Sequence, residues 1–226
     1  MTLHMRVNGD ATLNQVSPHL NTPRVSVYRN YLKRLFDVSL VILFLPIVGP
    51  LILAMAFLAA LDGHNPFYSQ LRVGKDGRFF RLWKIRTMTI DADDRLEAFL
   101  KKDASARKEW ERDQKLKNDP RITKVGRFLR KASLDELPQL LNVLQGSMSL
   151  VGPRPMMPDQ EKYYFGSAYY SLRPGVTGFW QISERNESSF AGRVAFDDAY
   201  SSEISFWTDF TTLLKTVLVV VRGTGY

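Results

Sequence analysis

The chain has 226 residues, of which 31 are Lys or Arg and 23 are Asp or Glu, so its formal net charge is +8. That length suits one domain with a small appendage and allows a sizeable core. The absence of cysteine excludes disulfides, thiolate nucleophiles and cysteine-ligated metals, and the three separated histidines form no HExxH-type pattern. The positive charge favours an anionic partner, which could be nucleic acid, a phosphorylated substrate or a membrane surface.

Residues 1–30 are polar, contain Pro18 and Pro23, and show no sustained hydrophobic period. This composition predicts a flexible N-terminal arm.

A long apolar segment follows the arm. Residues 38–61 contain no charged side chain, and Ser39 is their one clearly polar residue. As a helix, 24 residues would extend about 36 Å, enough to cross the hydrocarbon core of a bilayer. A cleaved signal peptide is disfavoured because some 35 residues precede the segment and no small-residue cleavage site follows it. A buried helix of a soluble protein is the less favoured alternative.

The middle of this segment contains helix breakers. Pro46, Gly49 and Pro50 lie there, and proline bends a helix because it removes a backbone hydrogen bond. Basic residues flank the segment on both sides, which favours placing both ends in the cytoplasm. We therefore predict a re-entrant membrane helix over residues 31–63 in preference to a single span.

Residues 64–226 are predicted to form a cytoplasmic domain. Phe79–Ile85 has the composition of a strand, after a turn at residues 74–77. Residues 91–117 favour one or two amphipathic helices. Residues 101–131 carry +7 of the net charge. Such a charge run is typical of a solvated helix face or of contact with anionic headgroups. Residues 211–222 predict a helix that is either part of the core or interfacial.

The segment from Ser133 to Pro155 is the richest in candidate functional residues. Ser133 and Glu136 have the spacing of a capping box, and leucines at 134, 137, 141 and 144 predict the buried face of the helix that would follow. Asp135 and Glu136 could simply be acids favoured by the helix dipole. The same position would keep a carboxylate ionised, able to attack phosphorus or to hold a divalent cation.

Several cations could complete a phosphate site. Arg154 lies between two prolines in an extended segment, and its planar fork suits bidentate phosphate binding. Lys84 and Arg86 alternate on the predicted strand and so share a face. Arg173 precedes Pro174-Gly175 in a similar turn. Together these residues suit a bound diphosphate with a metal ion.

These motifs, in this order, resemble those of the bacterial sugar transferase family, the monotopic polyprenyl-phosphate phosphoglycosyl transferases. The resemblance extends from residue 33 to residue 226. Its motifs are Lys33-Arg34-Leu35-Phe36-Asp37, Gln70-Leu71-Arg72-Val73-Gly74, Lys84-Ile85-Arg86-Thr87-Met88, Asn118-Asp119-Pro120-Arg121-Ile122-Thr123, Leu134-Asp135-Glu136-Leu137-Pro138-Gln139, Ser149-Leu150-Val151-Gly152-Pro153-Arg154-Pro155 and Arg173-Pro174-Gly175-Val176-Thr177-Gly178. The short chain, without further transmembrane helices, resembles members that act in exopolysaccharide production, the undecaprenyl-phosphate galactose phosphotransferases.

The resemblance implies an α+β, mainly helical fold with a re-entrant membrane helix, broken near Leu45-Pro46, and interfacial amphipathic helices. It implies transfer of a sugar 1-phosphate from a UDP-sugar, with UDP-galactose expected, to undecaprenyl phosphate, with release of UMP, as the first step of exopolysaccharide repeat-unit assembly. Asp135 would be the nucleophile and a ligand of Mg²⁺, and Glu136 would assist it. The substrate-binding residues would be Lys84, Arg86, Arg154 and Arg173. The protein would lie at the cytoplasmic face of the bacterial inner membrane, in contact with its lipids.

Two other classes of function were weighed. A membrane-anchored nucleic-acid-binding module is disfavoured, because the basic run lacks interleaved aromatic residues, so we expect no nucleic-acid partner. A non-catalytic scaffold for polysaccharide assembly is disfavoured by the intact Asp135-Glu136 pair. No residue in the sequence identifies the sugar or the oligomeric state, although the charged helices would allow a homo-oligomer.

Overall fold

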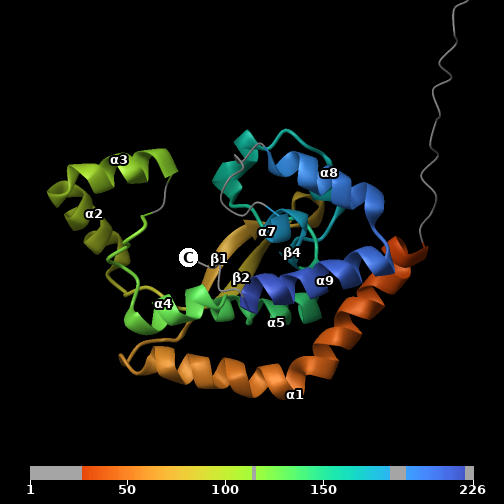
Figure 1. Cartoon of the computed structure of the whole chain (residues 1–226), viewed down its shortest axis with the longest axis horizontal. Coiled ribbons are helices and arrows are strands. Elements are labelled where there is room, and N and C mark those ends of the chain that lie inside the picture. Colours follow the sequence, from red (N-terminus) through yellow and green to blue (C-terminus); the bar gives the residue numbers. More distant parts are fainter. Residues whose placement is uncertain (1–26, 114–115, 184–191, 222–226) are drawn as a thin grey trace, which may run out of the picture.

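The computed structural model describes residues 27–113, 116–183 and 192–221, so nearly all of the predicted arm, residues 1–30, lies outside the described part. The described chain is mainly helical with two small sheets, which confirms the coarse fold class (Figure 1). The helices are α1 (Lys33–Ala60), α2 (Ala92–Lys102), α3 (Ala104–Asp113), α4 (Lys124–Lys131), α5 (Gln139–Gln145), α6 (Ala168–Ser171), α7 (Phe179–Ser183), α8 (Arg193–Glu203) and α9 (Phe206–Val221). The strands are β1 (Phe67–Val73), β2 (Phe79–Ile85), β3 (Ser149–Val151) and β4 (Gly175–Thr177).

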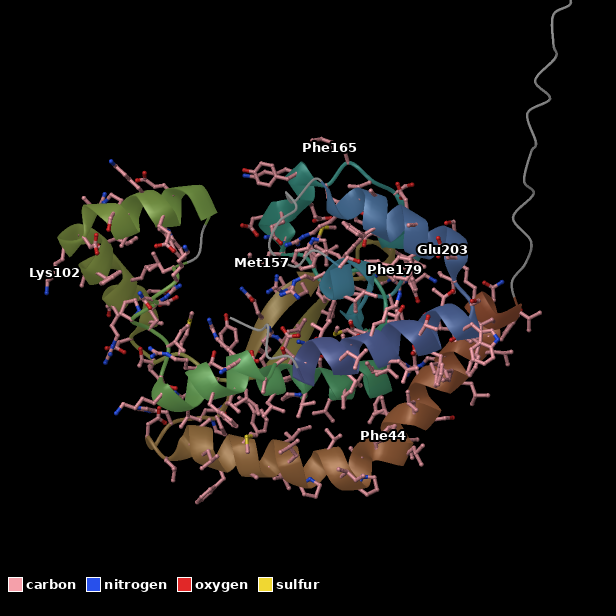
Figure 2. The ribbon with its side chains drawn as sticks, viewed as in Figure 1. Phe44, Lys102, Met157, Phe165, Phe179 and Glu203 are labelled. Carbon is pink, nitrogen blue, oxygen red and sulfur yellow. The ribbon has the colours of Figure 1, made fainter. Side chains whose placement is uncertain are left out.

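Helix α1 is a single helix from Lys33 to Ala60, but it is sharply bent (Figure 1). A π-helical turn, Tyr28–Leu32, leads into it, so the helical segment begins before residue 31, where the predicted membrane helix begins. Figure 2 shows the bend beside Phe44. The ring of Pro46 excludes the carbonyl group four residues earlier, which accounts for a bend on the N-terminal side of that proline.

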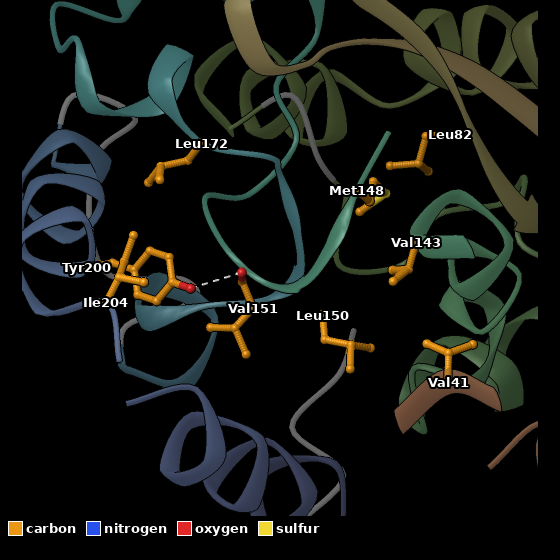
Figure 3. Close-up of a cluster of buried hydrophobic side chains, with 9 residues drawn as sticks. All are labelled: Val41, Leu82, Val143, Met148, Leu150, Val151, Leu172, Tyr200 and Ile204. Carbon is orange, nitrogen blue, oxygen red and sulfur yellow. Dashed lines mark hydrogen bonds between the residues drawn. The ribbon is translucent and has the colours of Figure 1, made fainter. Parts of the chain in front are cut away.

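Helix α1 is apolar, yet few of its residues are buried. Tyr28–Ala60 is the one helix among the described residues that is long and apolar enough to cross a membrane, and only 11% of its most apolar stretch is buried. A core helix of a soluble protein would be mostly covered, so the structure disfavours that alternative. Val41 is an exception, because it joins the main hydrophobic cluster with Val143, Leu150 and Tyr200 (Figure 3).

The predicted strand and turn are both present. β1 and β2 form an antiparallel hairpin whose loop contains Asp76 and Gly77 at positive φ. Helix α5 is fastened to β2 by the buried side chain of Asn142. Its Oδ1 accepts from the Trp83 N–H at 3.1 Å, and its Nδ2 donates to the Arg81 carbonyl at 2.8 Å. These bonds set the distance between β2 and the chain segment just before α5.

The predicted amphipathic helices are confirmed as the pair α2 and α3, which stands to one side of the main body (Figure 1). The chain then enters α4, whose N-cap Thr123 accepts a hydrogen bond from the N–H of Gly126 at 2.9 Å. Gly126 packs against the backbone of Thr87, and an added Cβ would overlap the Thr87 carbonyl oxygen. Glycine at this position therefore allows α4 to lie close to the end of β2.

Helix α9 contains the described part of the C-terminal apolar segment. Its inner face is buried at Asp209 and Thr212. Its outer face exposes a stripe of apolar side chains that includes Trp207, Leu214 and Val217. A core helix would bury that stripe, so the structure disfavours the core alternative, and the interfacial helix stays a prediction.

Candidate active site

Asp135 and Glu136 lie in a short 3-10 turn, Leu134–Glu136, and not in the first turn of a helix. Helix α5 begins only at Gln139, after Pro138. The predicted capping box is wrong, because Ser133 adopts a left-handed conformation (φ 54°) and its side chain makes no cap hydrogen bond. Proline at 138 delays the helix, so the chain turns before α5 begins.

This displacement also changes which face of α5 is buried. The predicted leucine face is wrong at Leu141, which is exposed. Gln139, Asn142 and Val143 are buried in its place. The hydrogen bonds from Asn142 to β2 explain why a polar residue occupies the inner face.

The two adjacent carboxyl groups have different surroundings. Glu136 forms an ion pair with Lys84 of β2, with 2.7 Å between Oε1 and Nζ. Asp135 is buried, and burial raises the pKa of its carboxyl group. The nearby ammonium of Lys84 acts in the opposite direction and lowers that pKa. The 3-10 turn supplies no helix dipole to favour the charged form of Asp135, and burial is the larger effect on its pKa.

A pocket of about 230 Å³ opens beside Glu136, and the buried Asp135 is not among the residues that line it. Lys84 and Glu136 line one part of it, and three arginines, Arg72, Arg154 and Arg193, line another. Burial and mutual repulsion lower the pKa of Arg193 to about 10, and the same two causes lower the pKa of Arg72. Partly buried cations that repel one another are stabilised by a bound anion, so the pocket is suited to a phosphate-bearing ligand.

Trp180 holds two of these arginines in place. The guanidinium of Arg193 lies 4.4 Å from the indole centroid, and that of Arg154 lies 5.3 Å from it. Such cation–π contacts fix the side chains without neutralising their charge. The guanidinium groups therefore remain charged and ordered at the pocket wall.

Two of the predicted substrate-binding residues lie elsewhere. Arg86 forms a two-bonded ion pair with Asp62, at 2.7 Å for each bond, and donates to the carbonyl of Ala59 at the end of α1. Arg173 is exposed and donates to the carbonyl of Gly146. Neither residue lines the pocket. Substrate binding by Arg86 and Arg173 stays a prediction, and the geometry of the described residues gives it no support.

Sequence reasoning missed several residues of the pocket. Arg72 belongs to the Gln70–Gly74 motif but has no predicted role there, and Trp180, Gln181 and Arg193 are absent from the predicted site residues. The alternation of β1 was the available signal for Arg72. No local pattern marks Arg193, because its place at the pocket depends on how α8 packs against α7.

The acid pair is compatible with Mg²⁺. Among the described residues no group of three His, Cys, Asp or Glu side chains could hold a metal ion. Protein-bound Mg²⁺ commonly uses one or two carboxylates and takes its other ligands from substrate phosphates and water. Asp135, with Glu136 beside it and a phosphate pocket adjoining, fits that type of site.

Asp197 of α8 gives the structure a pH-dependent element. Burial raises the pKa of this carboxyl group to about 7, and it accepts a hydrogen bond from the Tyr164 hydroxyl at 2.8 Å. The stabilisation that the protein gains from a neutral Asp197 is therefore present at acid pH and is lost as the pH rises through about 7.

An Asp197→Asn variant keeps an acceptor but has no charge. We expect the melting temperature of this variant, relative to that of wild type, to be higher at about pH 8.5 than at about pH 5.5. Thermal unfolding measured at both pH values checks this prediction. The control is Glu203→Gln, at an exposed position on the same helix. The same change in melting temperature with pH for wild type and Asp197→Asn would contradict the prediction.

A family model and several known proteins match this sequence. The model of the bacterial sugar transferase family matches residues 28–223, which include the bent helix, the acid pair and the pocket. The chain belongs to the bacterial sugar transferase family.

Individual members of this bacterial sugar transferase family show the same relationship. The chain is 47% identical over 197 residues to an undecaprenyl-phosphate galactose phosphotransferase of Salmonella typhimurium and 45% identical over 197 residues to a UDP-galactose-lipid carrier transferase of Erwinia amylovora. Each alignment covers 86% of this chain but only 41% of the relative. The exopolysaccharide production protein ExoY of Rhizobium meliloti is 45% identical over 196 residues, which are 85% of this chain and 87% of ExoY. The sugar transferase chain therefore spans about two fifths of the first two relatives and most of the third.

Proposed function

We propose that this chain is an undecaprenyl-phosphate sugar phosphotransferase that takes a sugar 1-phosphate from a UDP-sugar and releases UMP. The observation that carries the proposal is a pocket lined by three arginines and by the Lys84–Glu136 ion pair, with the buried Asp135 directly before Glu136 in the chain. The names of the relatives support galactose 1-phosphate as the transferred group and exopolysaccharide repeat-unit assembly as the process.

In the proposed reaction Asp135 is the nucleophile. A carboxylate oxygen of Asp135 attacks the sugar-bearing phosphorus of the UDP-sugar, the bond from that phosphorus to the bridging oxygen breaks, and UMP leaves with the bonding electrons. A phosphate oxygen of undecaprenyl phosphate then attacks the same phosphorus and restores the Asp135 carboxylate. Lys84 favours the charged, nucleophilic form of Asp135 by lowering its pKa. Glu136 faces the pocket, where it can orient the acceptor phosphate.

The three arginines of the pocket would bind the phosphates of the leaving nucleotide. Arg72, Arg154 and Arg193 would neutralise the diphosphate and then the charge that builds on UMP. Mg²⁺, held by Asp135, would supply further neutralisation of the diphosphate. The contacts of Arg154 and Arg193 with Trp180 keep their guanidinium groups ordered before the substrate arrives.

The membrane location is part of the proposal. The bent, exposed α1 would enter one leaflet and return, with both basic ends on the cytoplasmic side of the inner membrane. Phe36 of α1 packs against Phe206 of α9, with their ring centroids 5.3 Å apart. The exposed stripe of α9 is therefore continuous with the membrane helix, so both can contact lipid.

A panel of UDP-sugars tests the proposed function. Protein purified in detergent or in nanodiscs is mixed with each UDP-sugar, Mg²⁺ and undecaprenyl phosphate, and UMP is measured. We expect sustained UMP release only when the lipid phosphate is present, with UDP-galactose as the best donor. Equal rates without the lipid phosphate would contradict phosphosugar transfer, and a faster rate with another sugar would correct the donor alone.

A further inference from the structure

The first turns of α1 make buried polar contacts with β3. Asp37 lies one residue before the uncharged segment and is 2% exposed. Its Oδ2 accepts from the Ser149 hydroxyl at 2.6 Å, and its Oδ1 accepts from the Leu150 N–H at 3.3 Å. A carboxyl group at the start of an apolar helix is costly to bury, so its two partners on β3 indicate a specific role.

A second set of contacts reaches the end of β3 through α9. Asp209 is fully buried and accepts from Lys33 Nζ and from the Tyr200 hydroxyl, both at 2.7 Å. The Tyr200 hydroxyl also lies 3.1 Å from the Val151 carbonyl oxygen (Figure 3). Together with the bonds of Asp37, these interactions form what we term the α1–β3 contact. Its members are Lys33, Asp37, Ser149, Leu150, Val151, Tyr200 and Asp209.

The chain between β3 and the pocket is held firmly. The Gly152 N–H donates to the Thr177 carbonyl at 2.9 Å, and the Gly175 N–H donates to the Pro153 carbonyl at 2.8 Å. Gly152 lies so close to the Arg173 carbonyl that no side chain fits there. Arg154 follows directly and reaches the pocket. A displacement of β3 therefore moves Arg154, because the intervening residues have no freedom to absorb it.

We infer that Asp37 is a positioning residue. Through the α1–β3 contact it holds Arg154 at the pocket only when the start of α1 is packed against β3. The inference rests on the proposed function. Ordinary membrane insertion would be served equally well by an apolar residue at position 37, whereas alignment of β3 requires an acceptor there. The position of α1 relative to β3 and the geometry of the phosphate pocket are thereby coupled.

The first test compares Asp37→Ala with Ser39→Ala, an exposed control on the same helix. Asp37→Ala is expected to lower kcat/KM for the UDP-sugar about 10²-fold, as a displaced binding group does, and to weaken inhibition by UMP. Asp37→Asn, which keeps an acceptor and a similar volume, should recover much of the loss. Membrane association and the Ser39→Ala rates should match wild type. Wild-type kinetics in Asp37→Ala would overturn the inference, whereas an inactive wild type would count against the proposed function.

A double-mutant cycle separates positioning from a general loss of stability. If Asp37 acts through Arg154, then Arg154→Ala costs much less in the Asp37→Ala background than alone, by about tenfold. Lys84→Ala serves as the control, because Lys84 contacts Glu136 and takes no part in the α1–β3 contact; its effect should be additive with Asp37→Ala. Should Asp37→Ala fail to fold, Ser149→Ala removes one bond of the contact and enters the same two cycles. Additivity with Arg154 would overturn the inference.

Discussion

An Asp135→Asn variant is expected to lose UMP-forming activity by on the order of 10³-fold or more, because an amide cannot replace a carboxylate that forms a covalent bond to phosphorus. The substitution keeps the size of the side chain and removes a carboxyl group whose burial raises its pKa. The folded state should therefore be retained or slightly stabilised. Initial rates of UMP release and thermal unfolding, measured on the same preparations, check both parts.

Trapping the intermediate identifies the nucleophile directly. Incubation with labelled UDP-sugar in the absence of undecaprenyl phosphate should leave a phosphosugar on the peptide that contains residue 135. Glu136→Gln should still form this adduct, although more slowly, and Asp135→Asn should not. Exposed Glu97→Gln, which loses only a surface pair with Lys101, serves as the control and should match wild type. An adduct on Glu136 in the wild type would contradict the assignment.

Arg154→Ala is expected to lower kcat/KM for the UDP-sugar about 10- to 100-fold, the usual cost of removing a hydrogen bond to a charged group. Its guanidinium lines the pocket and lies over Trp180, so its loss removes a fixed positive charge from the phosphate site. The inhibition constant of UMP should rise by a similar factor. Arg154→Lys should recover only part of the activity, because an ammonium lacks the planar fork of arginine.

Arg173→Ala provides the matched comparison. Both arginines were selected from similar proline-containing turns, but only Arg154 lines the pocket. We expect Arg173→Ala to leave KM for the UDP-sugar and inhibition by UMP close to wild type. A loss equal to that of Arg154→Ala would show that Arg173 reaches the substrate and that the pocket extends beyond its described lining.

Features that depend on neighbouring residues alone were predicted well. The apolar run with Pro46 predicted a re-entrant membrane helix; a bend is present beside Phe44, and the re-entrant path stays a prediction. Alternation in Phe79–Ile85 predicted a strand, and charge patterning predicted the helices α2 and α3. The segment around Asp135 was predicted less well, because Ser133 and Glu136 have the spacing of a cap but Pro138 delays the helix that they would cap.

The sequence by itself determined the family, the basic and cysteine-free character, the apolar membrane segment and the adjacent acids, because each is a matter of composition or of short spacing. Tertiary structure alone decided which cations meet those acids. Lys84 reaches Glu136 because Asn142 fastens α5 to β2, while Arg86, two residues further on, pairs with Asp62. Arg72 and Arg193 come from segments more than a hundred residues apart and meet at one pocket. Contacts of that separation depend on how whole elements pack, and no local pattern in the chain specifies them.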